Sequence, residues 1–441
     1  MKADEDLQQI IVVGGGAGGL ELATRLGDTL GKRRQAAITL VDCSMTHLWK
    51  PLLHEVAAGA LNSYEDELSY MAQAHWHHFR FRPGRMDRLD REQRQISLAP
   101  STDERGKEYI PRRSFHYDTL VIAVGSITND FTIPGVREHC MFLDTRVEAD
   151  QFHQSLIRNY FTAQTQQGPL REGQLRIAIA GAGATGVELS AELHEATRQI
   201  VEYGLDRINP EDVKITLIEA SDRILSALPE RLSRLTAEAL GKIRVEVLTG
   251  HRIVQATAEG FQTARGLFIP AEIKVWAAGI KAPDFLQDID GLETNALNQL
   301  VVLPTLQTTR DENIFAFGDC AACPLPGGGT VPPRAQSAHQ QASMLIKSMR
   351  CRLGRKPLPA YRYVDYGSLI NMSRYSTVGN LMGNLTGRIS GNFMIEGVFA
   401  RLVYLSLYKL HQLALHGVVR VIVSTLANLL THRVKPRMKL H

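Results

Sequence analysis

Two glycine-rich segments share a spacing that suits phosphate binding. Residues 14–19 read GGGAGG after the apolar run 10–13, and residues 181–186 read GAGATG after the run 177–180. In the pattern G-x-G-x-x-G between a buried strand and a helix, the glycines let the backbone approach a pyrophosphate at the helix N-terminus. One such motif is a weak signal, but two on one chain predict two dinucleotide sites. The residues expected to line them are Gly14, Gly16, Ala17 and Gly19 in the first turn and Gly181, Gly183, Thr185 and Gly186 in the second.

An acidic residue follows each turn, at the end of the next expected strand. Asp42 comes after the apolar segment 38–41, and Glu219 comes after segment 213–218. A carboxylate at this position accepts hydrogen bonds from a ribose 2′-hydroxyl. Because a carboxylate repels a 2′-phosphate, Glu219 predicts a preference for NADH over NADPH, which Arg223 nearby would soften. Two dinucleotides on one chain favour relayed electron transfer, most simply from a nicotinamide to a flavin.

The elements that must position these residues are two β-α-β units, at 8–42 and 175–219. Each unit is followed by an apolar strand with a glycine end, at 117–126 and at 273–279, which lets the backbone approach a ligand or a helix. The chain then returns to a strand at 313–319, so the first domain is predicted to be discontinuous, with the second inserted into it. The residues expected to face a ligand from these three strand ends are Ala123, Gly125, Ala278, Gly279, Gly318 and Asp319.

Between and after these units the sequence predicts smaller elements. Segment 100–113 is polar and predicts a surface hairpin or loop, 335–349 predicts a helix, and 361–395 predicts short strands with glycine turns. The predicted fold class is α/β, with two Rossmann-like dinucleotide-binding domains followed by a C-terminal helical region that associates with a membrane.

The amino-acid composition is compatible with this predicted fold and excludes few functions. The 441 residues are 44% hydrophobic and 22% charged, which is ordinary for a globular protein of two or three domains. The net charge of +4 indicates no particular partner, and no nucleic-acid binding is predicted. The acidic segment 1–6 has no signal-peptide layout, so we expect the catalytic body in the cytoplasm.

The spacing of the cysteines and histidines does not indicate a disulfide framework or a metal site. Five cysteines suit a reducing compartment better than a disulfide framework. Cys320 and Cys323 have C-x-x-C spacing without a second pair, so a metal or redox role competes with two incidental thiols. The histidines of segment 75–78 lack a matching set of carboxylates or thiols, and we predict no metal site.

The C-terminal segment is basic and partly apolar. From residue 397 onward there are seven Lys or Arg residues and no Asp or Glu. The apolar run 418–430 has 13 residues, too few to cross a hydrocarbon core of about 30 Å. We therefore predict amphipathic helices that lie flat in the membrane interface, where their cations meet anionic head groups. A dimer interface or a core-packing helix is the alternative. The residues behind this prediction are Leu402, Leu405 and Leu413 on the apolar side and Arg401, Lys409, Arg420, Arg433, Lys435, Arg437 and Lys439 as cations.

Taken together, these residues resemble type II NADH dehydrogenases, the single-subunit, non-proton-pumping NADH:quinone oxidoreductases of respiratory membranes, in their bacterial form. The resemblance rests on the two glycine turns, the basic tail and four short segments. The glycine and Gly-Asp motifs are shared with the wider family of two-dinucleotide flavoproteins, so they alone do not select the member. The four segments are 47–55 (HLWKPLLHE), 276–279 (WAAG), 317–319 (FGD) and 335–341 (AQSAHQQ).

The resemblance implies a distribution of cofactors. A non-covalent FAD would lie on the first turn with Asp42 on its ribose, and Gly318-Asp319 would complete the flavin site. NADH would bind the second turn as substrate. The implied domains are a FAD-binding domain at 1–148 and 296–345, an NADH-binding domain at 149–295, and a C-terminal region at 346–441.

The resemblance also implies four catalytic residues, each with a plainer alternative. Glu188 would lie near the nicotinamide and the flavin ring, although an acid in the first turn of a helix is also favoured by the helix dipole. Lys50 would place positive charge near the flavin, or is simply solvated. Gln336 and Gln340 share one helix face and would donate hydrogen bonds to a quinone, or form a solvated face. His339 is expected to be structural.

The predicted function is a respiratory-chain flavoenzyme that passes two electrons from NADH through FAD to a membrane quinone such as ubiquinone, without proton pumping. We expect a homodimer bound peripherally to the cytoplasmic face of the cell membrane. No thiol pair accompanies Cys43 near the flavin segment, so electrons are expected to leave the flavin directly. The rival interpretations are a soluble reductase of ferredoxin or a disulfide, and a redox-sensing flavoprotein.

Overall fold

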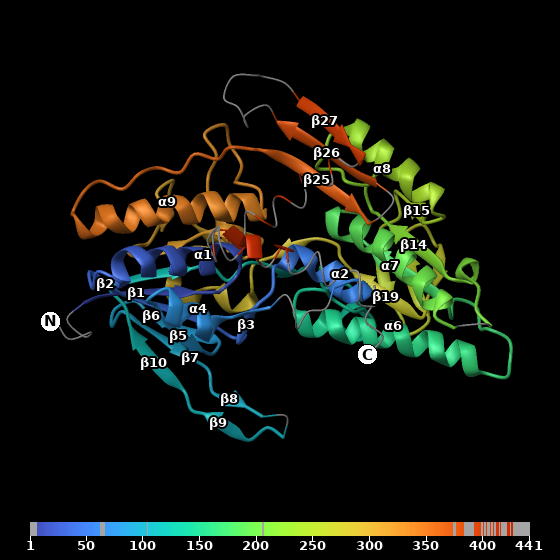
Figure 1. The fold of residues 1–441 in the computed structure, drawn as a ribbon, viewed down its shortest axis with the longest axis horizontal. Helices are drawn as coiled ribbons and strands as arrows, with labels where there is room; N and C mark the ends of the chain where they lie inside the picture. The colour runs from blue at the N-terminus through green and yellow to red at the C-terminus, as the bar shows by residue number, and fades with distance from the viewer. Residues whose placement is uncertain are drawn as a thin grey trace. The chain divides into compact units, whose positions relative to one another are not determined.

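The computed structural model describes most of the chain in two compact units (Figure 1). The described residues are 7–61, 67–103, 105–204, 207–373, 376–382 and 392–397, with scattered positions from 400 to 426. The first unit comprises Met1–Trp49, Glu67–Ile127 and Ile280–Val364, and the second comprises Lys50–Asp66, Thr128–Gly279 and Asp365–His441.

The first unit is built on a six-stranded sheet in the order β22-β23-β11-β1-β2-β5. Its strands pair in parallel except β22, which is antiparallel to β23. The strands β1, β2 and β11 are runs of Ile, Val, Leu and Ala whose residues are nearly all buried, as expected for parallel strands covered on both faces. The strands are β1 (Gln8–Val13), β2 (Ala36–Asp42), β5 (Arg80–Pro83), β11 (Thr119–Ile122), β22 (Gln307–Thr308) and β23 (Asp311–Ala316).

Two long helices of the first unit pack side by side. Helix α1 (Ala17–Leu26) continues into a short π-helix at Gly27–Gly31, and α9 (Ala335–Leu353) lies along it (Figure 1). Helix α9 is therefore confirmed at its predicted start and runs four residues longer than predicted. The short helix α4 (Tyr70–Trp76) precedes β5.

A second, antiparallel sheet belongs to the first unit. Its three strands pair in the order β10-β7-β6. The polar segment predicted at 100–113 is confirmed as a hairpin of two short strands that pair with each other. The strands are β6 (Met86–Asp90), β7 (Gln95–Leu98), β8 (Ser101–Thr102), β9 (Glu108–Ile110) and β10 (Arg113–His116).

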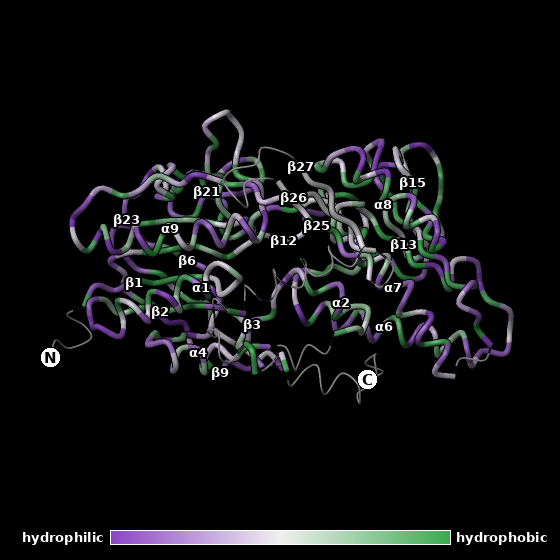
Figure 2. Tube along the Cα trace, turned by 45° about the horizontal axis from the view of Figure 1, so that its top comes forward, coloured by the Kyte–Doolittle hydropathy of each residue, from purple (hydrophilic) through white to green (hydrophobic). Residues whose placement is uncertain are grey.

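The second unit repeats the same β-α-β plan. A four-stranded parallel sheet has the order β15-β14-β13-β19. Hydrophobic residues run along the strands and hydrophilic ones mark the connecting loops (Figure 2). The strands are β13 (Arg176–Ala180), β14 (Lys214–Ile218), β15 (Glu246–Leu248) and β19 (Ile273–Trp276), and the helices are α2 (Leu53–Ala58), α6 (Arg146–Thr165), α7 (Ala184–Glu202) and α8 (Glu230–Lys242).

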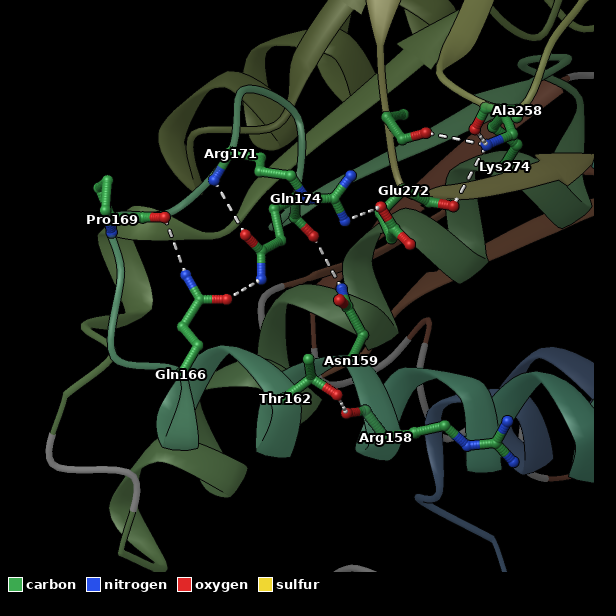
Figure 3. A network of polar contacts seen from close by, with 11 residues as sticks. Arg158, Asn159, Thr162, Gln166, Pro169, Arg171, Gln174, Ala258, Glu272 and Lys274 are labelled. Atoms are coloured by element: carbon green, nitrogen blue, oxygen red, sulfur yellow. Dashed lines mark hydrogen bonds and ion pairs between the residues drawn. The ribbon is translucent and has the colours of Figure 1, made fainter.

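A network of polar contacts connects α6, the loop before β13 and the residues around the start of β19 (Figure 3). Asn159 on α6 donates its Nδ2 to the carbonyl of Gln174 at 2.9 Å, and the Gln174 side chain donates to Gln166 Oε1 at 2.6 Å. On β19 the buried Lys274 donates its Nζ to the carbonyl of Ala258 at 2.7 Å. These bonds satisfy polar groups that would be costly to bury unpaired.

Two antiparallel sheets complete the second unit. One pairs β16 (Ile253–Ala256), β17 (Gly260–Thr263) and β18 (Phe268–Pro270). The other pairs β25 (Gly367–Met372), β26 (Ser376–Met382) and β27 (Asn392–Glu396), which confirms the strands predicted at 361–395. Strand β25 packs against α7.

The tail is described only at scattered positions. Those from 397 to 426 are helical, among them Lys409 and Leu413, and Ile422, Val423 and Leu426 are more than half exposed. Across the described residues, none of the helices has the length and apolarity needed to cross a membrane. The remaining residues of the predicted amphipathic face lie outside the described part: Arg401, Leu402, Leu405, Arg420, Arg433, Lys435, Arg437 and Lys439.

The compact units divide the chain at other points than the predicted domains. Segments 50–66 and 128–148 belong to the second unit, and 280–295 and 346–364 belong to the first. The cause is packing between elements distant in sequence: α2 lies on α6 and α7, and α9 lies on α1. The assignment of FAD and NADH to parts of the chain stays a prediction.

Candidate dinucleotide sites and catalytic residues

The first glycine turn connects β1 to α1 and needs its glycines for two different reasons. Gly14 has φ +101°, and a Cβ there would collide with the backbone at Ala123, the residue that follows β11. A Cβ on Gly19 would collide with the carbonyl oxygen of Gly14. Gly16, the N-cap of α1, has open space where its Cβ would stand. The turn is thus closely packed toward the sheet and open beside the first residue of the helix, Ala17.

Asp42 at the end of β2 is bonded to the same turn. Its Oδ2 accepts from the backbone N–H of Gly15 at 2.6 Å, and its Oδ1 accepts from Ser44 N–H at 2.7 Å. Burial raises the pKa of this carboxyl, against the two backbone bonds. The carbonyl of Gly15 accepts from Tyr70 Oη at 2.7 Å and lies 2.9 Å from His47 Nδ1. Tyr70 could not be predicted from the sequence pattern, because only the packing of α4 brings it to the turn.

The third part of this site is the turn Gly318–Cys320 after β23. Gly318 has φ +73° and donates its N–H to Gln341 Oε1 at 2.8 Å. Asp319 Oδ2 accepts from Ser126 Oγ at 2.8 Å, so this turn meets the end of β11, next to Gly125. Gln341 is buried and was not predicted, although it stands in the same QQ pair as Gln340.

The two predicted glutamines of α9 differ in their surroundings. Gln340 binds the backbone of Val364 in both directions: Nε2 donates to the carbonyl at 2.8 Å, and Oε1 accepts from the N–H at 3.1 Å. Gln336 lies one turn earlier and is partly buried. Ala338, between these two glutamines, lies close to Gly18 and Gly318.

The second glycine turn, between β13 and α7, has the same construction. Gly181 has φ +98°, and a Cβ there would lie 2.7 Å from the carbonyl oxygen of Ala277, after β19. A Cβ on Gly186 would collide with the carbonyl oxygen of Gly181, whereas Gly183 has open space. Thr185 is exposed in the first turn of α7. The two β-α-β units therefore present the same open position beside a helix N-terminus, a geometry suited to an anion.

Glu219 is bonded to the second glycine turn in the same way as Asp42 is bonded to the first. Its Oε2 accepts from Ala182 N–H at 2.8 Å, and its Oε1 accepts from Ser221 N–H at 2.8 Å. The guanidinium of Arg223 is used inside its own loop, where it donates to three backbone carbonyls. These belong to Leu225 (3.3 Å), Ser226 (2.6 Å) and Leu228 (2.9 Å).

The end of β19 is fixed by neighbouring backbone. Trp276 donates its Nε1 to the carbonyl of Asn129 at 2.8 Å, and Asn129 N–H donates to the carbonyl of Gly279 at 3.2 Å. Gly279 has φ +69° and lies against the ring of Phe131, so Ala278 and Gly279 form a tight corner beside the second turn.

Glu188 is buried in the second unit, on a different turn of its helix from the one expected. Helix α7 begins at Ala184, so Glu188 is its fifth residue and no acid stands in the first turn. The helix dipole therefore does not explain an acid at this position, because its effect is confined to the first turn. Glu188 Oε1 accepts from Asn371 N–H on β25 at 3.0 Å, and burial raises the pKa of Glu188 to about 8.

Next to Glu188 lies a histidine, His54, that the sequence did not predict as a site residue. His54 on α2 is buried, and its Nδ1 is 3.9 Å from Glu188 Oε2. Burial lowers the pKa of His54 to about 4. The one sequence feature that could have indicated His54 is its place in segment 47–55. At neutral pH both groups are therefore uncharged.

Lys50 pairs with an acid of the second unit. Its Nζ lies 3.1 Å from Asp144 Oδ1, and its side chain is 46% exposed. Asp144 also accepts from Thr128 N–H at 2.8 Å. The Lys50 ammonium thus has a carboxylate partner, while the neighbouring side chains of Trp49 and Leu52 are buried.

The thiols and histidines form no second chemical centre in the described part. All five cysteines are free, and burial raises the pKa of Cys320 to about 12 and that of Cys323 to about 11. Such pKa values disfavour the reactive thiolate. No group of three metal-ligating side chains occurs among the described residues. His339 pairs with Glu21 on α1 at 2.5 Å, a contact between two packed helices.

Known proteins share this architecture. The chain matches the family model of pyridine nucleotide-disulphide oxidoreductases over residues 8–342. A type II NADH:quinone oxidoreductase of Haemophilus influenzae is 42% identical over 99% of this chain and 100% of that protein. One from Staphylococcus aureus is 26% identical over 91% and 96%. The solved structure of NDH2 from Plasmodium falciparum in complex with NADH has a TM-score of 0.81, with 18% identity over 98% of this chain and 100% of that one. This last likeness concerns the fold.

Proposed function

This chain belongs to the family of type II NADH:quinone oxidoreductases, within the pyridine nucleotide-disulphide oxidoreductases, and on that premise we propose that it passes two electrons from NADH through FAD to a membrane quinone. The observation that carries the proposal is the repeated geometry of the two glycine turns. In both units a carboxylate at the end of the second strand bonds to the turn, and an open glycine precedes the helix.

The first unit supplies residues that fit a bound FAD. The open position at Gly16 would receive the diphosphate, and Asp42 would accept hydrogen bonds from the ribose. The turn at Gly318-Asp319 would hold the flavin end of the cofactor. When bound, FAD supplies an acceptor for the hydride of NADH and a donor of electrons to quinone.

The second unit would bind NADH in the same manner. Gly183 gives room for the diphosphate, and Glu219 would accept from the ribose hydroxyls. Because the Arg223 guanidinium already donates to three carbonyls of its own loop, fewer of its N–H groups remain to bind a 2′-phosphate. The proposed preference for NADH over NADPH rests on Glu219 and Arg223.

Four further residues have proposed roles in the reaction. Glu188, uncharged at neutral pH because of its raised pKa, would orient the reduced nicotinamide. Lys50 would contribute positive charge toward the flavin. Gln336 would donate to a quinone carbonyl, and Gln340 would support the site by holding the backbone of Val364.

A turnover assay tests this proposal. The purified full-length protein should release FAD on denaturation and should oxidise NADH with a short-chain quinone in the presence of detergent. NADPH should be a poor substrate, and Gln336→Ala should lower quinone reduction. Protein without flavin, equal turnover of NADPH, or quinone reduction unaffected by Gln336→Ala would contradict the corresponding part of the proposal.

We place the enzyme on the cytoplasmic face of the cell membrane as a peripheral homodimer, in a scheme without proton pumping. Support for membrane contact comes from the exposed apolar residues Ile422, Val423 and Leu426 and from the basic tail. Removal of the chain after Met394 should leave flavin binding intact and release the protein from anionic vesicles. If the shortened protein stays on the vesicles, another surface makes the membrane contact. If the intact protein sediments as a monomer, the proposed homodimer is wrong.

A further inference from the structure

We propose that the aromatic ring of Phe131 forms the nicotinamide side of the NADH site. The inference rests on the proposed function, because it takes the second glycine turn to be the place where NADH binds. It adds to that site a side chain that the sequence pattern does not predict.

The order of the strands gives the bound nucleotide its direction. In the sheet β15-β14-β13-β19, the second glycine turn follows β13, with β14 on one side and β19 on the other. Glu219 follows β14 directly and is the proposed partner of the adenosine ribose. A dinucleotide with its diphosphate at the turn lies across the carboxyl ends of the strands. Its nicotinamide half would therefore extend over the end of β19, toward Gly279.

Phe131 lies at this end of β19. A Cβ on Gly181 would lie 2.7 Å from the Cα of Ala278, and a Cβ on Gly279 would collide with the ring of Phe131. The glycine turn, the corner at Ala278 and Gly279, and the ring are thus successive neighbours. Phe131 is 52% exposed, so about half of this large apolar residue is open to a ligand.

The equivalent corner of the first unit lacks such a ring. Gly125 comes three residues after the end of β11, as Gly279 comes three residues after the end of β19, and both glycines have φ +69°. A Cβ on Gly125 would meet no atom within 4 Å, whereas one on Gly279 would meet Phe131. The ring is therefore a feature of the second site and not of the backbone plan that the two units share.

The loop that carries the ring has a strained backbone. Phe131 has φ +51° and Thr132 has φ +54°, in the left-handed region that residues other than glycine rarely adopt. Asn129 Oδ1 accepts from Phe131 N–H at 2.9 Å, and Asp130 Oδ1 accepts from Thr132 N–H at 3.3 Å. Arg137 donates to the other carboxylate oxygen of Asp130. Strain that the surroundings hold in place is found preferentially at ligand sites.

The same loop is bonded to the strand end that it covers. Asn129 N–H donates to the carbonyl of Gly279 at 3.2 Å, and the carbonyl of Asn129 accepts from Trp276 Nε1 at 2.8 Å. These bonds fix the backbone of the loop relative to β19. The Phe131 ring is therefore placed before a ligand arrives, which lowers the entropy cost of binding.

The chemistry of a phenyl ring suits the nicotinamide half. Aromatic side chains stack on the flat rings of nucleotides, and the contact also removes apolar surface from water. A phenyl ring has neither a hydrogen-bond donor nor an ionisable group. Phe131 would therefore contribute affinity for the nucleotide and no acid–base chemistry.

Ligands that contain different parts of NADH test this assignment. NAD⁺ contains both halves, whereas ADP contains only the adenosine half with the diphosphate. In calorimetric titrations of the flavin-loaded protein, Phe131→Ala should weaken NAD⁺ binding about tenfold, a loss expected for one aromatic ring stacked on a base. It should leave ADP binding unchanged. Phe131→Tyr keeps the ring and should keep the affinity for NAD⁺.

Phe161→Ala is the matched control, because Phe161 is 55% exposed in the same unit and belongs to α6. It should change the affinity for neither ligand. An equal loss of NAD⁺ and ADP affinity in Phe131→Ala would assign the ring to packing of the unit. An unchanged affinity for NAD⁺ would show that Phe131 is not part of the site. If the unmodified protein binds neither ligand or does not oxidise NADH, the proposed function fails instead.

A second variant separates the ring from the strained backbone. Phe131→Gly removes the ring and suits a positive φ, so it should weaken NAD⁺ binding as much as Phe131→Ala does without lowering the melting temperature. In steady-state assays both variants should raise the KM for NADH about tenfold and leave the KM for a short-chain quinone unchanged. An equal rise of both KM values would overturn the assignment.

Discussion

Replacement of Glu188 by glutamine should change the way stability depends on pH. The carboxyl of an unfolded chain titrates near 4.5, whereas burial raises the folded-state pKa of Glu188 to about 8. Between these values the folded protein holds a proton that the unfolded chain has released, so stability falls as the pH rises. Glutamine carries no such proton and keeps a similar shape.

The magnitude follows from the shift. Each pKa unit corresponds to about 1.4 kcal/mol, so from the usual 4.5 to pH 7 the native carboxyl costs the wild-type protein about 3 kcal/mol. The full shift to about 8 corresponds to about 5 kcal/mol. The difference in unfolding free energy, wild type minus variant, should therefore decline across this window and be flat below it and above it.

The assay is urea unfolding of both flavin-loaded proteins, followed by circular dichroism at a series of pH values. His54, whose pKa is lowered to about 4, gives an opposite trend at acid pH, but it is present in both proteins and cancels in the difference. Curves that run parallel across the window would refute the buried, protonated carboxyl. A difference that rises with pH would indicate an ionised, paired carboxylate.

Three further outcomes follow from the glycine turns and their partners. Gly186→Ala should prevent folding of the second unit, because the added Cβ collides with the backbone, and melting curves test this. Gly183→Ala should fold normally but raise the KM for NADH, which steady-state kinetics test. Glu219→Gln should raise the NADH KM about tenfold, in line with about 1.5 kcal/mol for a bond to a charged group, and an unchanged KM would remove Glu219 from the ribose. Gln341→Leu should destabilise the protein by about 1–3 kcal/mol through the unpaired N–H of Gly318, with loss of flavin on gel filtration, and full flavin content would contradict this.

The local pattern of the sequence was sufficient for much of the fold. Buried strands followed by glycine turns predicted both β-α-β units, and the polar segment at 100–113 predicted its hairpin. These elements depend on residues close together in the chain, so their signals survive in the sequence. The start of α7 was misplaced relative to Glu188, because no side-chain cap marks that helix N-terminus.

The partners of the site residues were harder to predict, because they come from distant elements. Tyr70 reaches Gly15 across 55 positions of sequence, and Gln341 reaches Gly318 across 23. His54 meets Glu188 only through the packing of α2 on α7. Residue type and spacing pointed to Asp42 and Glu219, whereas the second residue of each such pair required the three-dimensional structure.

Helix α9 holds two parts of the first unit with neighbouring amides. Gln340 binds the backbone of Val364, and Gln341 binds the N–H of Gly318. A rotation or slide of this helix would displace both side chains together, because they leave the same turn. A compound that displaces Val364 should therefore shift the visible spectrum of a chromophore held at Gly318, which offers an optical screen for inhibitors that needs no turnover.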